Sequence, residues 1–109
     1  MFTINRKTNR MFISRGDSGH FTVNFTGDVP SDGTKVLFTV VKQTGGIPYI
    51  SKTLECASGA VEVSITSRDT NRLTPGDYYW DLRVKFSDDE VSTPMYVSLF
   101  TVLEVAGNV

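Results

Sequence analysis

The stretch of sequence that decides the fold is LTPGDYYWDLRVKF, Leu73–Phe86. From residue 77 to residue 87 large apolar side chains occupy every second position, and this period of two is typical of a β-strand with one buried face. One face carries Tyr78, Trp80, Leu82, Val84 and Phe86, and the other carries Tyr79, Asp81, Arg83 and Lys85. The chain is therefore expected to contain a long strand with a large aromatic side chain at its centre.

A turn followed by a tyrosine opens this strand. In immunoglobulin-like sandwiches, a tyrosine early in strand F folds back so that its hydroxyl bonds to upstream backbone, and a core residue follows two positions later. Tyr78 fits that corner, and Trp80 stands where antibody domains place a cysteine. We therefore predict that the Tyr78 hydroxyl bonds to backbone and that Trp80 fills the space between two sheets.

Shorter segments of alternating character lie on both sides of this strand, separated by Gly, Pro, Asp and Ser. Such spacing is the pattern of an all-β sandwich or barrel. The expected strands are residues 10–14, 20–26, 34–43, 47–54, 60–66, 77–87 and 94–105, and residues 67–76 are expected to form a 3₁₀-like turn and a loop. About seven strands in 109 residues predict one domain, residues 1–109, with an all-β, immunoglobulin-like two-sheet sandwich fold.

The charge distribution argues against several classes of partner. The formal net charge is −1, whereas a general nucleic-acid binder needs a large positive field, so no nucleic-acid partner is expected. Arg6, Lys7, Arg10 and Arg15 nevertheless fall in a stretch of 15 residues without an acidic side chain. We interpret residues 1–9 as a solvated N-terminal arm rather than a phosphate-binding one.

Cysteine content and hydropathy indicate where the protein folds. Cys56 is the single cysteine, so stability must come from packing rather than from an internal disulfide, and a reducing cytoplasm is acceptable. The N-terminal sequence MFTINRKTNR has no apolar core, so no signal peptide is expected. No apolar run approaches the ~20 residues that cross a bilayer, so no membrane partner is expected.

The chemistry-bearing residues do not form a pattern that predicts catalysis, a metal site or a cofactor, and we expect a protein that is not an enzyme. Arg15-Gly16-Asp17 spells the integrin tripeptide, but Gly16 is already explained as a strand breaker. His20 and Cys56 have no neighbouring base or ligand in the sequence. Asp77, Asp81 and the carboxylates at 88–90 lie near one another in the sequence, but calcium needs six to eight oxygens arranged around it, and we interpret 88–90 as a solvated hairpin.

Two groups of residues are candidates for a contact surface. Tyr79 and Arg83 point away from the predicted core, and an exposed aromatic beside cationic side chains suits a sugar or a protein, although ordinary cross-strand pairing explains the same pattern. Arg6, Lys7 and Arg10 form the second group. The last strand is apolar on both faces, so its outer face needs a cover: the N-terminal segment, a second copy or a partner protein.

Several longer motifs carry a resemblance. They are ISRGDSG (13–19), VLFTVVK (36–42), TSRDTNRLTPGDY (66–78), WDL (80–82), TP (93–94) and FTVLE (100–104). The chain resembles small phage and prophage proteins of Gram-positive gut bacteria, and it is similar to the N-terminal domain of lactococcal phage upper-baseplate proteins. This resemblance implies an immunoglobulin-like fold, with Gly16 and Gly76 as turns and Leu73, Tyr78 and Trp80 as core. In contrast to the baseplate proteins, we expect no fibre or stalk segment after the domain.

Two functions follow as expectations. The resemblance implies a non-enzymatic structural or assembly module of a bacteriophage or prophage particle, in the tail, baseplate or head fibre, assembled in the bacterial cytoplasm. Its partners would be phage structural proteins or further copies of itself. The alternative is a stand-alone adhesion domain that binds a surface glycan or a protein through Tyr79 and its neighbours.

Overall fold

The computed structural model describes residues 1–27, 29–43, 45–86 and 91–106 of the chain, and within them it has eight strands and one short helix. In chain order the elements are β1 (Phe2–Ile4), β2 (Met11–Ser14), β3 (Gly19–Asn24), β4 (Lys35–Val41), β5 (Pro48–Glu55), β6 (Ala60–Ile65), α1 (Ser67–Asn71), β7 (Gly76–Lys85) and β8 (Val91–Leu103). All the strands predicted from the alternation are present. β1 is an addition to them.

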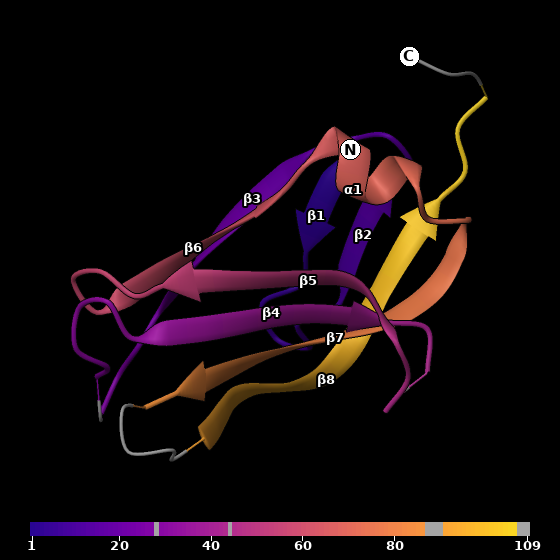
Figure 1. Cartoon of the computed structure of the whole chain (residues 1–109). Coiled ribbons are helices and arrows are strands. Elements are labelled where there is room, and N and C mark those ends of the chain that lie inside the picture. The colour runs from indigo at the N-terminus through magenta and orange to yellow at the C-terminus, as the bar shows by residue number, and fades with distance from the viewer. Residues whose placement is uncertain (28, 44, 87–90, 107–109) are drawn as a thin grey trace.

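The strands form two layers, as predicted for an all-β, immunoglobulin-like sandwich (Figure 1). One layer is a six-stranded sheet with the order β1-β2-β8-β7-β4-β5, and the other consists of β3 and β6 alone. Neighbouring strands are antiparallel, except that β2 runs parallel to β8. The layers are therefore very unequal in width. The side of the six-stranded sheet that points away from β3 and β6 has no layer over it among the described residues.

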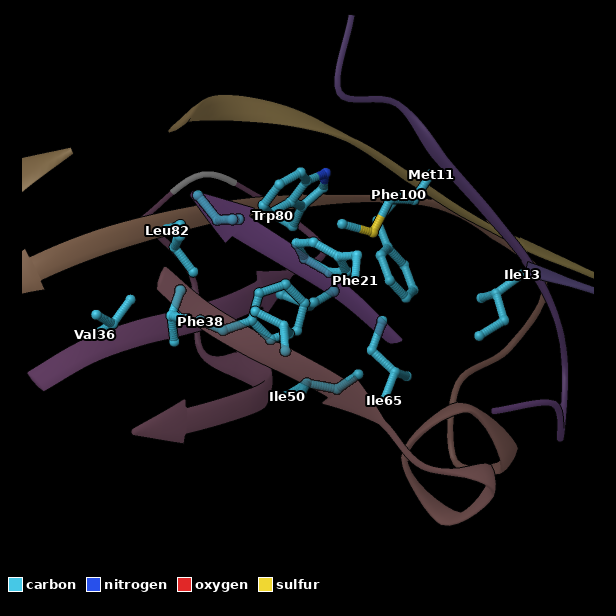
Figure 2. Packing of buried hydrophobic residues seen from close by; sticks show 14 of the residues in the cluster. Met11, Ile13, Phe21, Val36, Phe38, Ile50, Ile65, Trp80, Leu82 and Phe100 are labelled. Atoms are coloured by element: carbon cyan, nitrogen blue, oxygen red, sulfur yellow. The ribbon is translucent and has the colours of Figure 1, made fainter. Parts of the chain in front are cut away.

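The core lies between the two sheets and is built from the inward positions of every long strand (Figure 2). Trp80 is 1% exposed and occupies its centre. Its ring centroid lies 5.6 Å from that of Phe21 on the opposite sheet and 5.8 Å from that of Phe38 on the neighbouring strand. Its indole N–H donates to the Asn9 carbonyl at 2.9 Å, so the one polar atom of the side chain also has a partner.

The tyrosine corner is present at the start of β7. The Tyr78 hydroxyl donates to the Thr74 carbonyl at 2.9 Å, and the ring is buried against Lys42, whose Nζ lies 4.3 Å from the ring centroid. Leu73 is 1% exposed, so it belongs to the same core. Gly76, the first residue of β7, has a φ of 142°. Residues other than glycine rarely adopt this backbone conformation, which explains the glycine at this position.

Residues 67–71 form a short α-helix where the sequence pattern predicted a 3₁₀-like turn. The reason is a complete capping box: the Thr66 hydroxyl accepts from the Asp69 N–H, and the Asp69 carboxylate accepts from the Thr66 N–H. The buried Thr70 hydroxyl then donates to the Asp17 carbonyl and accepts from the Gly16 N–H. The helix is thereby fastened to the β2–β3 turn, where Gly16 takes a φ of 87°.

The N-terminal segment is not a free arm, in contrast to the prediction for residues 1–9. β1 pairs with β2 in an antiparallel register of Phe2 with Ile13 and Ile4 with Met11. The Phe2 ring stacks on Phe21 with centroids 6.3 Å apart, so a core contact holds the strand as well as its backbone bonds. The basic residues predicted a solvated arm. Phe2 and Ile4 did not indicate a strand, because two apolar residues are too few to give a recognisable alternation.

Candidate contact surface

The candidate site is the outer face of the six-stranded sheet, by which we mean the side of β4, β5, β7 and β8 that points away from β3 and β6. Because side chains alternate along a strand, burial of Trp80 and Leu82 turns Tyr79, Asp81 and Arg83 toward this face. Tyr79 is half-buried and Arg83 is exposed, so both have the orientation that the sequence pattern predicted.

Pairing of the strands groups the outward side chains into rows. Val41 of β4 lies opposite Tyr79, which lies opposite Leu99 of β8. In the next rows of the β4–β7 ladder, Thr39 lies opposite Asp81 and Leu37 opposite Arg83. The centre of the outer face is therefore largely apolar, with one acid and one base beside it.

Two shallow hollows lie on the outer face. The first has a volume of about 300 Å³ and is lined by Leu37, Val41, Tyr79, Asp81, Arg83 and Val97, among others. The second, about 470 Å³, lies toward the β7–β8 hairpin and adds Lys35 and Lys85 while sharing Leu37 and Arg83. A hollowed face with apolar walls and a few charges is suited to binding another molecule.

Apolar side chains remain open on this face. Val97 is 49% exposed and Leu37 is 36% exposed. Apart from this face, the β4–β5 hairpin presents Ile47, which is 87% exposed, and Tyr49, whose ring centroid lies 5.6 Å from that of the buried Tyr78. None of the described residues covers Val97 and Leu37, because the N-terminal segment extends the sheet through β1 rather than crossing its outer face.

Asp81 is the acidic side chain of the outer face whose pKa is shifted. Partial burial raises the pKa of Asp81 above its usual value, while the nearby Arg83 guanidinium acts to lower it. The side chain is thus poorly solvated where it stands, and a partner that donates a hydrogen bond would relieve that cost.

The remaining predicted contact residues do not form a single surface with Tyr79 and Arg83. Arg10 lies on the same outer face but at its far side, where it donates to the Thr101 hydroxyl at 3.4 Å and its guanidinium stacks over Phe12 at 4.6 Å. Arg6 instead lines a hollow beside β3, and Lys7 is exposed in the β1–β2 turn. The predicted basic arm is therefore divided between two faces.

The integrin-like tripeptide is used internally. The Arg15 side chain donates to the Asn71 carbonyl at 3.1 Å, and the Asp17 carboxylate forms an ion pair with the N-terminal amino group. Gly16 supplies the turn between them. All three residues thus hold the β2–β3 turn against α1 and β1.

The other chemistry-bearing residues lie apart from one another. His20 is exposed on β3, and Cys56 is 1% exposed with its thiol directed at the Pro30 carbonyl, 3.8 Å away. Asp77 accepts from the Thr101 hydroxyl at 2.7 Å. Within the described ranges no three His, Cys, Asp or Glu side chains cluster as metal ligands would, and no helix is long and apolar enough to cross a membrane. The carboxylates at 88–90 lie outside the described residues.

Sequence reasoning named Tyr79 and Arg83 but missed the apolar partners that make the outer face distinctive. These are Leu37 and Val97. Leu37 was detectable, because it lies between Val36 and Phe38 and so points to the opposite face of its strand. Val97 was not, because β8 is apolar on both faces and the sequence does not show which face is covered.

Comparison with known proteins adds little to this description. No family model and no curated protein matches the chain. A solved structure with a similar arrangement is described as "a putative glycoside hydrolase from Bacteroides vulgatus ATCC 8482", at 12% sequence identity and a TM-score of 0.48. The match covers 87% of this chain and 16% of that protein. By its fold and its candidate site, the protein is an immunoglobulin-like β-sandwich with one broad, open sheet face.

Proposed function

We propose that this chain is a non-enzymatic assembly module of a bacteriophage or prophage particle, in the tail, baseplate or head fibre. It works by surface contact, binding a phage structural protein or a further copy of itself through the outer face of the six-stranded sheet. The resemblance of residues 13–104 to phage and prophage proteins supports the setting.

The open outer face is the observation that carries the proposal. Three covers were expected for the surplus apolar side chains: the N-terminal segment, a second copy and a partner protein. The pairing of β1 with β2 removes the first of these, because β1 lies in the plane of the sheet. Leu37 and Val97 therefore remain available for a contact with another molecule.

The experiment compares two valines of equal exposure. Val97 on the outer face is 49% exposed, and Val29 in the β3–β4 loop is 50% exposed. Light scattering on the pure protein measures self-association, and capture from a phage lysate with mass spectrometry identifies a bound structural protein. We expect Val97→Asp to weaken the contact by at least about 10-fold, equivalent to about 1.4 kcal/mol, while Val29→Asp leaves it unchanged.

A monomer that captures no virion structural protein, or equal binding by the two variants, would contradict the assembly role. Thermal unfolding of both variants is the control. Since both valines are half-exposed, each change should alter stability by only about 0.5 kcal/mol.

Adhesion is the second candidate function, and the hollow beside Tyr79 favours it. An aromatic ring next to the Asp81 carboxylate and the Arg83 guanidinium offers a stacking surface with polar groups, which suits a sugar ring. A glycan array tests this directly. Tight binding that is lost in Tyr79→Ala, by a protein that captures no virion component, would favour adhesion over assembly.

A further inference from the structure

The two edges of the β3–β6 sheet differ in whether their outward backbone groups have hydrogen-bond partners. The free side of β6 is occupied: the Lys52 ammonium of β5 donates to the Ser64 carbonyl at 2.8 Å, and Ala60 bonds in both directions with Ala57. The other side of the sheet is the free edge of β3, where the remaining strand of a wider sheet would be expected. β1 pairs with β2 instead, so it does not fill that place.

The register of the sheet shows which backbone groups of β3 point outward. The Phe25 N–H donates to the Gly59 carbonyl at 2.9 Å, and the same register pairs Val23 with Val61 and Phe21 with Val63. Odd-numbered residues therefore bond to β6. In an antiparallel pair the alternate residues point their N–H and C=O groups to the other side, and on β3 these include Thr22 and Asn24. Within the described part of the chain no group bonds to either of these two backbones.

A hollow of about 240 Å³ lies along this free edge. It is lined by Thr22, Val23 and Asn24 from the strand and by Ile4, Arg6 and Asn9 from the N-terminal segment, with Phe21 at its base. Its walls thus offer unpaired backbone groups, apolar side chains and one guanidinium. No acidic side chain belongs to the lining.

β3 also lacks the devices that normally protect an edge strand. Its sequence, GHFTVN, contains no lysine, acid or proline, and its pairing with β6 runs over six residues without a bulge. A regular and uncharged edge of this kind is a template for strand addition.

We propose that the free edge of β3 accepts an extended, acidic peptide segment of a partner protein as an added strand. The backbone of that segment bonds to Thr22 and Asn24, its inward side chains enter the hollow beside Ile4, and its acidic side chain pairs with Arg6. A second copy of β3 fits less well, because two-fold pairing would bring two basic β1–β2 turns to one site. This inference rests on the assembly role proposed above and adds a second contact to it, at a surface separate from the outer face.

The test uses the sequence of β6, which pairs with the other edge of β3 and so suits the side chains of this strand. A synthetic peptide of residues 60–66 (AVEVSIT) carries one glutamate, and a second version carries lysine in its place. Amide hydrogen exchange by NMR should show Thr22 and Asn24 becoming protected when the glutamate peptide is added, while Phe21 and Val23 are protected before and after. The lysine peptide should bind at least about 10-fold more weakly. A version with N-methyl groups on alternate amides should not bind.

Variants of the protein make the test specific. Thr22→Pro removes an outward N–H without touching the bonds to β6, and Glu62→Pro makes the same change on the opposite edge of the sheet as its control. Arg6→Glu, with Lys7→Glu as its control, tests the charge without a risk to folding. We expect Thr22→Pro and Arg6→Glu each to weaken the glutamate peptide by at least about 10-fold, and the two controls to bind normally.

Three results would overturn the proposal. The first is no protection of the Thr22 and Asn24 amides at about 1 mM peptide, a concentration at which most specific contacts are formed. The others are protection of amides elsewhere in the protein instead, and equal binding of the glutamate and lysine peptides. Failure here differs from failure of the assembly role. A protein that loses its virion partner through Val97→Asp but keeps it in Thr22→Pro assembles through the outer face and does not use the β3 edge.

Discussion

Replacing Trp80 by alanine should remove a large share of the stability of the sandwich. The side chain is 1% exposed and contacts Phe21 across the sheets and Phe38 on the next strand. Truncation of a buried tryptophan costs about 3–5 kcal/mol through lost transfer energy and a cavity. The Asn9 carbonyl also loses its donor, which adds about 1 kcal/mol and places the expected cost at the upper end of the range.

Urea denaturation followed by far-UV circular dichroism measures this cost. Fluorescence is unsuitable, because Trp80 is the single tryptophan of the chain. With an m-value of about 2 kcal/mol per molar urea, a loss of about 4 kcal/mol lowers the midpoint by about 2 M. Val97→Ala on the outer face is the control and should move the midpoint by less than about 0.3 M. A Trp80→Ala midpoint within about 0.5 M of the wild type would refute the central placement of the indole.

Two further predictions concern polar contacts. Tyr78→Phe keeps the ring but removes the hydroxyl that bonds to Thr74, so we expect a loss of about 1 kcal/mol by urea denaturation, and an unchanged midpoint would contradict the corner. For Asp69, partial burial raises the pKa, but bonds from Lys52 and Thr66 outweigh it and hold the pKa below its usual value. The stability that this carboxylate contributes is therefore present above about pH 4 and lost as the pH falls through the lowered pKa. Asp69→Asn should be less stable than the wild type at pH 7 and should approach it near pH 2.5, and a constant difference across that range would show that charge is not the cause.

Much of the fold follows from the sequence, because long strands with one buried face show a clear alternation of apolar and polar residues. The alternation around Trp80 places it in the core, and Phe21 and Val23 of β3 are predicted in the same way. The helix could also have been predicted, since Thr66 and Asp69 have the spacing of a capping box. β1 could not, because a three-residue strand gains its stability from pairing with β2 and from the Phe2–Phe21 stack, both of which depend on tertiary structure.

The candidate surface was less predictable than the fold. Parity along β7 correctly turned Tyr79 and Arg83 outward. Which outward apolar residues remain uncovered depends on where the N-terminal segment packs, and no local pattern contains that information. The same holds for the free edge of β3, since the alternation of Phe21 and Val23 predicts a strand but not the number of its neighbours.

The parallel pairing of β2 with β8 has a consequence for the order of folding. Met11 lies opposite Phe100, and the Arg10–Thr101 hydrogen bond joins residues 91 positions apart. The β1–β2 hairpin therefore cannot join the rest of the large sheet until the end of the chain is present. Contacts of such separation form late and slow the folding of β-sandwiches. We therefore expect Met11 and Ile13, which are buried in the folded protein, to reach their final packing only after β8 has been synthesised. The basic residues of the first 15 positions, which carry no acid among them, would oppose association between two unfinished copies of this segment by like-charge repulsion.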